Sequence, residues 1–280
     1  MKCYDFSYDN KCLSDFGFIV CKFDSSGMET ISNGSTITFN TVSTMHGMKK
    51  ELTSSQYDEC ISATFQICKH SCTSGIQKIS LIEVREIMRW LNRKGFHKFK
   101  LLEEDYIDLF FEASFNVSKI EINGEVYGFE LEMTTNRPFA LQEARTITFK
   151  NTKEDIENNR VRLISNMSDE EGYVYPEMTV EITDLLSSDD GSEDNILDIY
   201  NETEDRHSIV KNCEIGEVLT FNYPIIQSSL GDGRSSQIQK DFNWVFFRMA
   251  NSFGNRINKV HFSLPCTITI KYNPIVKVGI

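Results

Sequence analysis

The sequence contains few histidines and no motif that would place one in a catalytic site. Only five occur in 280 residues, and they lie far apart along the chain. A phosphate-binding loop, a G-x-S-x-G turn and an H-E-x-x-H helix are all missing. The spacing gives no nucleophile and base to pair. An active site could still assemble from distant residues, but nothing in the sequence points to one, and we expect no enzyme activity, cofactor or metal ion.

Long apolar runs and closely paired cysteines are also missing. No stretch reaches the roughly 18 apolar residues of a membrane-spanning helix, and MKCYDFSYDNKCLSDFGF lacks the apolar part of a signal peptide. The eight cysteines are scattered without a C-x-x-C pair, which favours free thiols in a reducing compartment. We therefore expect synthesis in the cytoplasm and no membrane partner.

Positive charge is scarce in one segment. Residues 151–205 hold 17 Asp and Glu against 3 Lys and Arg, so this segment is more negative than the whole chain, whose formal net charge is −12. Tight nucleic-acid binding needs clustered Lys and Arg, which the sequence does not offer. The acidic excess has two explanations: it keeps the protein soluble, or it repels DNA that passes through a conduit without binding.

What the sequence does contain is a series of strand patterns. Residues 35–42 and 60–68 alternate polar and apolar side chains. Asn123-Gly124 separates two further strand-like segments and is a strong hairpin-turn sequence. These patterns predict a mainly β fold.

One amphipathic helix is predicted over Ser80–Lys94. Ser80 is a suitable N-cap, Glu83 completes a capping box with it, and Gly95 supplies the residue that ends the helix. Trp90 lies at the edge of the apolar stripe, where it either packs into the core or forms a platform for a ligand; the packed role is favoured. The stripe itself consists of Leu81, Val84, Ile87, Met88 and Leu91.

Two short segments contain metal-ligand residue types. Cys68, His70 and Cys72 form a C-x-H-x-C cluster, but no second knuckle completes a zinc site, and a strand end entering a loop is favoured. Residues 189–194 (DDGSED) lack the alternating order of a calcium loop, which favours a solvated acidic loop. We predict no metal at either segment.

Two domains are predicted, residues 1–145 and residues 146–280. The junction is predicted within residues 141–160, which include the polar, charged stretch NTKEDIENN. After it, short strands separated by turn residues are typical of a β-sandwich, and residues 184–205 are predicted to form an acidic loop. The fold class is therefore mainly β, with an N-terminal β-sandwich that carries one α-helix and a C-terminal β-sandwich.

Several segments occur in an order that is typical of one protein family. They are SDFGF at 14–18, the helix end RWL at 89–91, the strand region 101–115, GFEL at 128–131 and RPF at 137–139. In this order they resemble the N-terminal domain of the distal tail protein (Dit) family of bacteriophages with long, non-contractile tails. Three later segments are similar to the family's galectin-like C-terminal β-sandwich: YPEMTV at 175–180, GEVLTF at 216–221 and TITIKY at 267–272.

The resemblance implies a structural virion protein at the tail tip. Six copies would form a ring that joins the tail tube protein to the tail-tip hub, with DNA passing through its channel only in transit. The C-terminal domains would anchor host-adsorption components such as a receptor-binding protein. Assembly would take place in the host bacterial cytoplasm. The chain has no room for the carbohydrate-binding module inserted in larger family members.

One segment is a candidate for the contact between neighbouring copies in such a ring. Residues 44–52 (TMHGMKKEL) follow a strand and form either a hairpin arm that contacts a neighbour or an ordinary surface loop. The predicted interface residues are Thr44, Met45, His46, Gly47, Met48 and Lys49.

A carbohydrate-binding protein is the alternative function. Sugar sites combine an aromatic ring with hydrogen-bonding side chains, and NWVFFR supplies these as Asn243, Trp244 and Arg248. Phe246 and Phe247 in the same stretch favour core packing instead. A third function, hydrolysis, would be detected by a peptidoglycan-digestion assay.

Overall fold

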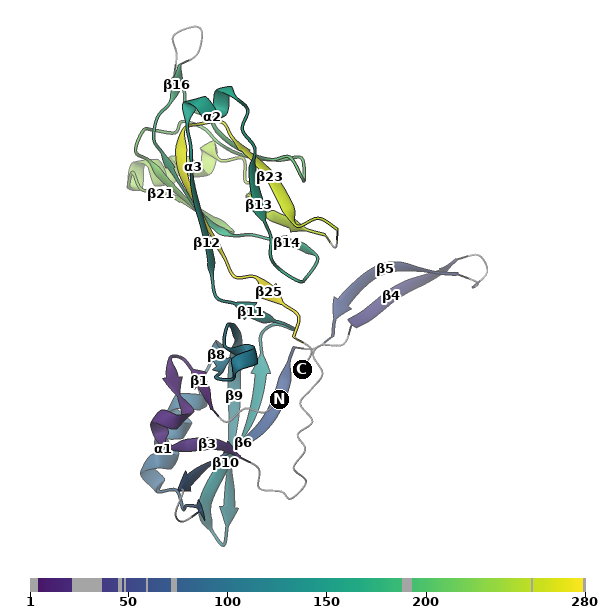
Figure 1. Cartoon of the computed structure of the whole chain (residues 1–280), viewed down its shortest axis with the longest axis vertical. Helices are drawn as coiled ribbons and strands as arrows, with labels where there is room; N and C mark the ends of the chain where they lie inside the picture. Colours follow the sequence, from purple (N-terminus) through teal and green to yellow (C-terminus); the bar gives the residue numbers. More distant parts are fainter. Residues whose placement is uncertain are drawn as a thin grey trace. The chain divides into compact units, whose positions relative to one another are not determined.

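The computed structural model describes residues 5–21, 37–44, 47, 49–58, 60–71, 75–187, 193–252 and 254–278. The chain divides into two compact units, Met1–Glu143 with Val276–Ile280 and Ala144–Ile275 (Figure 1). Strands dominate both units, so the mainly β, two-domain fold class is confirmed. Within the described ranges, no helix combines the length and the apolar character needed to cross a membrane.

The first unit is built around one sheet with strand order β2-β1-β8-β9-β10-β6-β3. These strands are β1 (Phe6–Tyr8), β2 (Lys11–Cys12), β3 (Phe18–Cys21), β6 (Ser62–Ser71), β8 (His97–Leu101), β9 (Leu109–Ile122) and β10 (Glu125–Thr135). The remaining elements are short: β7 (Gly75–Ile76), β11 (Ala140–Gln142), β25 (Ile275–Val276), and 3-10 helices at Leu13–Phe16 and Glu104–Tyr106. A separate hairpin consists of β4 (Ile37–Thr44) and β5 (Lys49–Tyr57).

The local strand predictions for this unit are confirmed. β9 and β10 pair as a hairpin, and its turn residues Asn123 and Gly124 have φ of +52° and +81°. Asn and Gly adopt this left-handed region more readily than other residues. In β6 and just before it, Ile61 and Ile67 are fully buried, as the alternation of residues 60–68 predicted.

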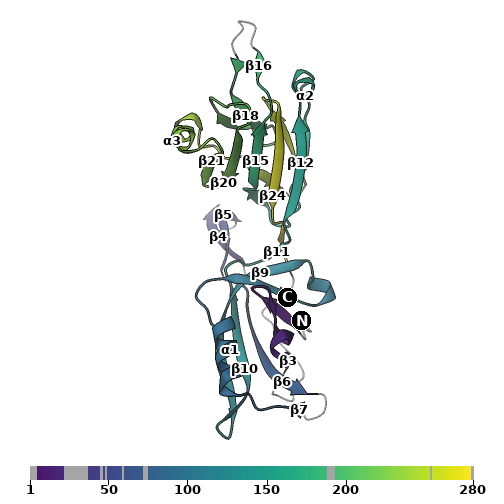
Figure 2. The same cartoon turned by 90° about the vertical axis from the view of Figure 1, so that its left-hand side faces the viewer.

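Helix α1 (Leu81–Leu91) lies along this sheet, where it contacts β9 (Figure 2). Its predicted start is confirmed, because Ser80 is the N-cap of a complete capping box with Glu83. Its predicted end is wrong by three residues. The helix stops where the Asn92 N–H bonds to the Met88 carbonyl, and Gly95, with φ of +92°, lies in the turn that follows.

The core of the first unit is rich in aromatic rings. Trp90 is buried, stacks on Phe16 with ring centroids 4.6 Å apart, and donates from Nε1 to the Tyr8 carbonyl at 2.9 Å. Phe6 stacks on the same indole at 5.9 Å. Trp90 therefore has the packed role that the sequence favoured: its hydrogen bond and ring contacts join α1 to β1.

The capping box of α1 makes the stability of the first unit depend on pH. The Glu83 carboxylate accepts hydrogen bonds from Lys69 Nζ and from the Ser80 N–H, and these donors, Lys69 first, lower the pKa of Glu83 to about 2. The ordinary pKa of a glutamate is about 4.3. Since folding lowers the pKa, the stabilisation is fully present above about pH 4.5 and is lost as the pH falls towards 2.

We expect Glu83→Gln to lower the free energy of unfolding of the first unit by roughly 1 kcal/mol near neutral pH. At about pH 2 the loss should be much smaller, because the wild-type carboxyl is then about half protonated in the folded state and has lost most of its pH-dependent stabilisation. Urea unfolding followed by tryptophan fluorescence at the two pH values measures the difference. Glu86→Gln is the control, since Glu86 is exposed on the same helix. An equal loss at both pH values would contradict the prediction.

The second unit is a β-sandwich of two main sheets, with orders β12-β24-β15-β20-β21 and β13-β23-β18-β19. Buried side chains of both sheets form one core, for example Val180 and Ile268 from the first and Ile199 and Val260 from the second. The strands of the first sheet are β12 (Arg145–Asn151), β15 (Glu177–Ile182), β20 (Val218–Asn222), β21 (Ile225–Ser228) and β24 (Cys266–Tyr272). Those of the second are β13 (Arg162–Ser165), β18 (Leu197–Asn201), β19 (Arg206–Val210) and β23 (Ile257–Phe262).

The remaining elements of this unit are short strand pairs and two helices. β14 (Gly172–Val174) pairs with β22 (Met249–Asn251), and β16 (Leu186–Ser187) pairs with β17 (Glu193–Asp194). The helices are α2 (Lys153–Glu157) and α3 (Asp232–Asp241). The structure thus differs from the acidic loop predicted over residues 184–205, since β16, β17 and β18 lie there. β18 forms because Leu197 and Ile199 alternate with polar residues and point into the core.

A buried ionic network joins α3 to the sandwich. The Arg234 side chain, 8% exposed, lies between the carboxylates of Glu217 and Asp241, whose side chains are 0% and 7% exposed. Arg234 donates to Glu217 Oε1 at 2.9 Å, to Asp241, and to the Lys211 carbonyl at 3.0 Å. Ser228 Oγ also donates to Glu217 Oε1, at 2.6 Å. The network satisfies charges that would be unfavourable to bury alone.

Candidate functional site

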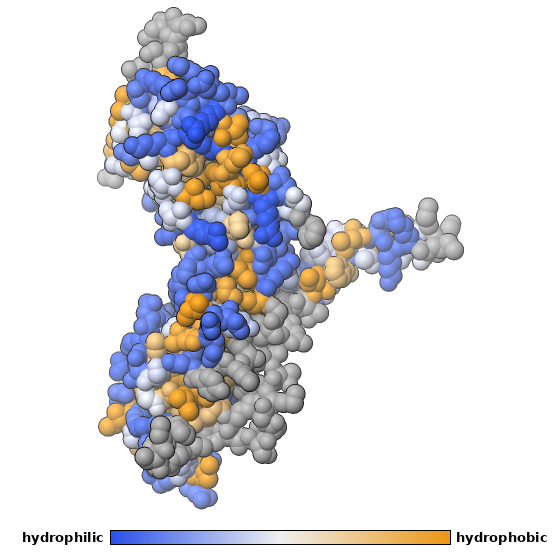
Figure 3. All heavy atoms as spheres, in the orientation of Figure 1, coloured by the Kyte–Doolittle hydropathy of each residue, from blue (hydrophilic) through white to orange (hydrophobic). Residues whose placement is uncertain are grey.

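The β4–β5 hairpin is the first candidate surface. Among the described strands, β4 and β5 pair with each other and with no third strand. A two-stranded hairpin is marginally stable alone in water, and this one exposes apolar side chains; Figure 3 shows hydrophobic surface (orange) on it. These side chains are Ile37, Phe39, Val42 and Leu52, which are 41%, 62%, 53% and 59% exposed. Exposed apolar surface of this kind marks an interaction site.

Three of the predicted interface residues, Thr44, Gly47 and Lys49, are described, and they lie at the far end of this hairpin. Thr44 ends β4 and Lys49 begins β5, and the two pair in register, with Thr44 Oγ1 donating to the Lys49 carbonyl at 3.3 Å. Gly47 lies in the connection with φ of +85°. Met45, His46 and Met48 lie outside the described residues. The segment is therefore part of a hairpin, and its role in contacting a neighbour stays a prediction.

The predicted glycan-contact residues are already bonded within the second unit. Asn243 accepts from the N–H groups of Ile209 and Val245 at 3.1 Å each. Arg248 pairs with Glu204 at 2.7 Å. Trp244 is 54% exposed, but its Nε1 donates to the Gln239 carbonyl at 3.0 Å.

Two neighbours of these residues, Phe246 and Phe247, are buried in the core, as the packing interpretation of NWVFFR predicted. A glycan role for Asn243, Trp244 and Arg248 stays a prediction.

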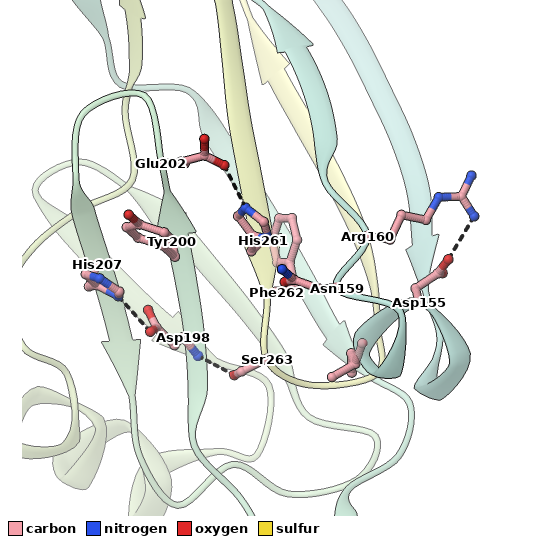
Figure 4. Close-up of a pocket in the computed structure, with 11 residues that line it drawn as sticks. Asp155, Asn159, Arg160, Asp198, Tyr200, Glu202, His207, His261, Phe262 and Ser263 are labelled. Atoms are coloured by element: carbon pink, nitrogen blue, oxygen red, sulfur yellow. Dashed lines mark hydrogen bonds and ion pairs between the residues drawn. The ribbon is translucent and has the colours of Figure 1, made fainter.

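A pocket of about 420 Å³ opens on the outer face of the β13-β23-β18-β19 sheet (Figure 4). Tyr200 of β18 pairs in register with His207 of β19 on one side and with His261 of β23 on the other. The Tyr200 ring stacks on both imidazoles, with centroids 4.1 Å from His207 and 5.7 Å from His261. The other residues that line the pocket are Asp155, Ile156, Asn159, Arg160, Asp198, Glu202, Phe262 and Ser263.

A carboxylate holds each of these imidazoles. Asp198 Oδ2 lies 2.7 Å from His207 Nδ1, and Glu202 Oε2 lies 3.2 Å from His261 Nε2. Glu202 also contacts Lys259 Nζ at 3.2 Å. Asp198 Oδ1 is shielded from solvent and has no hydrogen-bond partner. The two side chains of each pair therefore fix one another's orientation.

The opposite wall of the pocket comes from α2 and the residues after it. Asp155 completes a capping box with Thr152 and pairs with Arg160 and Arg162 at 2.8 Å each. Hydrogen bonding to Arg160, followed by the Thr152 N–H, lowers the pKa of Asp155 to about 2. This carboxylate is therefore ionised and neutralised at neutral pH.

Ser263 is the one hydroxyl-bearing residue other than Tyr200 among the residues that line this pocket. Its Oγ donates to the Ile196 carbonyl at 2.7 Å and accepts from the Asp198 N–H at 2.7 Å. The Ser263 hydroxyl thus has a structural role, and neither imidazole is its hydrogen-bond partner.

Comparison with known proteins identifies the family. A family model described as a phage tail protein N-terminal domain matches residues 1–137, and one described as a phage tail C-terminal domain matches residues 139–272. The chain belongs to this phage tail protein family. A search of curated proteins gives no match for the phage tail protein.

A solved structure shares the fold of the phage tail protein. It is the crystal structure of SPP1 Dit, described as a paradigm of the hub adsorption apparatus in phages that infect Gram-positive bacteria. The similarity covers 97% of this chain and 99% of that chain, with a TM-score of 0.60 at 10% sequence identity. Together with the family, this confirms the resemblance to Dit proteins that the sequence predicted.

Sequence reasoning missed the pocket of the phage tail protein because its residues come from separate strands. His207 and His261 are far apart in sequence, and only the pairing of β19, β18 and β23 brings them to Tyr200. The sequence signal that could have indicated the pocket was the polar side chain at an outward-facing position of each strand, Tyr200, His207 and His261. For metal binding, the described residues contain no group of three or more candidate ligands. Cys72 of the C-x-H-x-C cluster lies outside them.

Proposed function

We propose that this phage tail protein forms a ring of six copies at the tail tip. The ring joins the tail tube protein to the tail-tip hub, and DNA passes through its channel without stable binding. The second unit anchors host-adsorption components such as a receptor-binding protein. Assembly takes place in the host bacterial cytoplasm, and no step is catalytic.

The β4–β5 hairpin is the observation that carries this proposal. Its strands have no third strand to pair with among the described residues, and it exposes four large apolar side chains. A neighbouring copy that covers these side chains would supply the stabilisation that a lone hairpin lacks. In such an assembly one surface of each copy contacts a different surface of the next copy. If the rotation that relates neighbouring copies divides a full turn evenly, the copies close into a ring.

Two further observations support the assignment. The fold matches SPP1 Dit over nearly the whole of both chains. The acidic excess of residues 151–205 repels DNA, which is itself negatively charged. This repulsion suits a protein through which DNA passes without binding.

The purified full chain should form closed rings in negative-stain images and have a mass in mass photometry of six times the 32.3 kDa of one copy. The measurement is repeated with the tail tube and tail-tip hub proteins of the same phage, because some rings close only on a partner. A monomer that stays monodisperse at high concentration, alone and with both partners, would contradict the proposal.

A further inference from the structure

We propose that the pocket between the His207–Tyr200–His261 row and the loop after α2 binds a neutral saccharide unit. This site is distinct from Asn243, Trp244 and Arg248, and it does not depend on ring formation. Its volume of about 420 Å³ is within the roughly 300–1,000 Å³ range of small-molecule pockets.

The charges around the pocket favour a neutral ligand. Three carboxylates line it, those of Asp155, Asp198 and Glu202. Asp155 pairs with Arg160 and Arg162, and Glu202 with Lys259. The cations of Arg160, Arg162 and Lys259 therefore match the three carboxylates in number, so neither a phosphate nor an ammonium group finds the strong excess of opposite charge that would select it.

The hydrogen-bonding groups favour a ligand with several hydroxyls. A hydroxyl both donates and accepts, and the lining contains the carboxylates of Asp198 and Glu202 as acceptors and the side-chain amide of Asn159 as a donor (Figure 4). Asp198 Oδ1 has no donor, and a carboxylate oxygen left unsatisfied is costly. A ligand hydroxyl beside His207 can donate to the Asp198 carboxylate without displacing its contact with His207, because a carboxylate can accept several hydrogen bonds.

The pocket also offers the apolar contact that a sugar ring needs. Ile156 and Phe262 line it beside the polar groups. A sugar presents C–H groups on its faces and hydroxyls around its edge, so it can contact both kinds of lining at once. The His207–Asp198 and His261–Glu202 pairs hold the polar groups in place before a ligand arrives, which lowers the entropy cost of binding.

The test is saturation-transfer NMR on the full chain with methyl glycosides of glucose, galactose, rhamnose and N-acetylglucosamine as probes. Glucosamine and glucose 1-phosphate are the cationic and anionic comparators. At least one neutral sugar should bind saturably with a Kd on the order of millimolar, the range expected for a ligand of this size. Both charged comparators should bind more weakly.

Asp198→Asn and Glu202→Gln should each weaken that binding by roughly tenfold or more, since each removes a charged hydrogen-bond acceptor. Tyr173→Ala is the matched control, because it removes an exposed aromatic ring of the same unit outside the pocket, and binding should be unchanged. Circular dichroism of every variant checks folding.

Three results would overturn the proposal: no saturable binding of any neutral sugar up to about 50 mM, far above a millimolar Kd; binding unaffected by both pocket substitutions; or loss of binding in Tyr173→Ala alone. Mass photometry of the same samples reports ring formation separately. A failed ring and a failed sugar site are therefore distinguishable.

Discussion

Arg234→Ala is expected to lower the free energy of unfolding of the second unit by about 3–5 kcal/mol. The substitution leaves the carboxylates of Glu217 and Asp241 without their cation at positions that are 0% and 7% exposed. It also removes the donor to the Lys211 carbonyl. Thermal and urea unfolding report the loss, and the fluorescence of Trp244 follows this unit because its indole is bonded to Gln239 of α3.

Two further variants separate this effect from the loss of an ordinary surface arginine. Arg256→Ala removes a 45% exposed side chain whose contact with Asp169 is 3.8 Å long, and it should cost less than about 1 kcal/mol. The triple change Arg234→Met, Glu217→Gln and Asp241→Asn should recover part of the stability, because no charge is then buried unpaired. Similar losses for Arg234→Ala and Arg256→Ala would show that the network contributes little.

Phe39→Ser combined with Leu52→Ser is expected to abolish the ring while leaving each copy folded. Both side chains are mostly exposed, at 62% and 59%, so their removal costs the single chain little. A neighbour that buries them gains roughly 1.5–3 kcal/mol for each side chain, and losing both should weaken each contact at least about a hundredfold. Mass photometry and negative-stain imaging measure the assembly, and circular dichroism measures the folding.

Leu163→Ser is the matched control for the hairpin variant. Leu163 is a 67% exposed leucine that belongs to the second unit and not to the hairpin, and its substitution should leave the ring intact. Rings that persist in the Phe39 and Leu52 double variant would exclude the hairpin as the contact between copies. Equal loss of rings in Leu163→Ser would show that any exposed apolar-to-serine substitution disrupts assembly.

The features that could be predicted from the sequence are those fixed by neighbouring residues. The capping box of Ser80 and Glu83 and the turn at Asn123-Gly124 depend on residues a few positions apart, and both occur where expected. Trp90 was placed correctly because its position on the helix is set by helical periodicity. The family resemblance added the overall architecture, because it uses the order of segments along the chain.

The features that could not be predicted depend on contacts between distant segments. Helix α3 is almost entirely polar, so its sequence shows no apolar stripe. Its Arg234 forms an ion pair with Glu217, on the segment before β20, and this ion pair attaches the helix to the sandwich. The pocket around Tyr200 requires the register of three strands. No pattern within one strand specifies which strand will lie beside it, so the two imidazoles could not be placed together.

The return of the chain to its first unit at Val276 has a consequence for engineering. The sandwich of residues 144–275 enters and leaves the first unit through two covalent crossings, at Glu143–Ala144 and Ile275–Val276, so it is an insertion and not a C-terminal appendage. Insertions of this kind are tolerated where their two ends lie close together. A different domain inserted between Glu143 and Val276 would keep both segments of the first unit. Truncation after residue 143 would instead remove the second segment, Val276–Ile280.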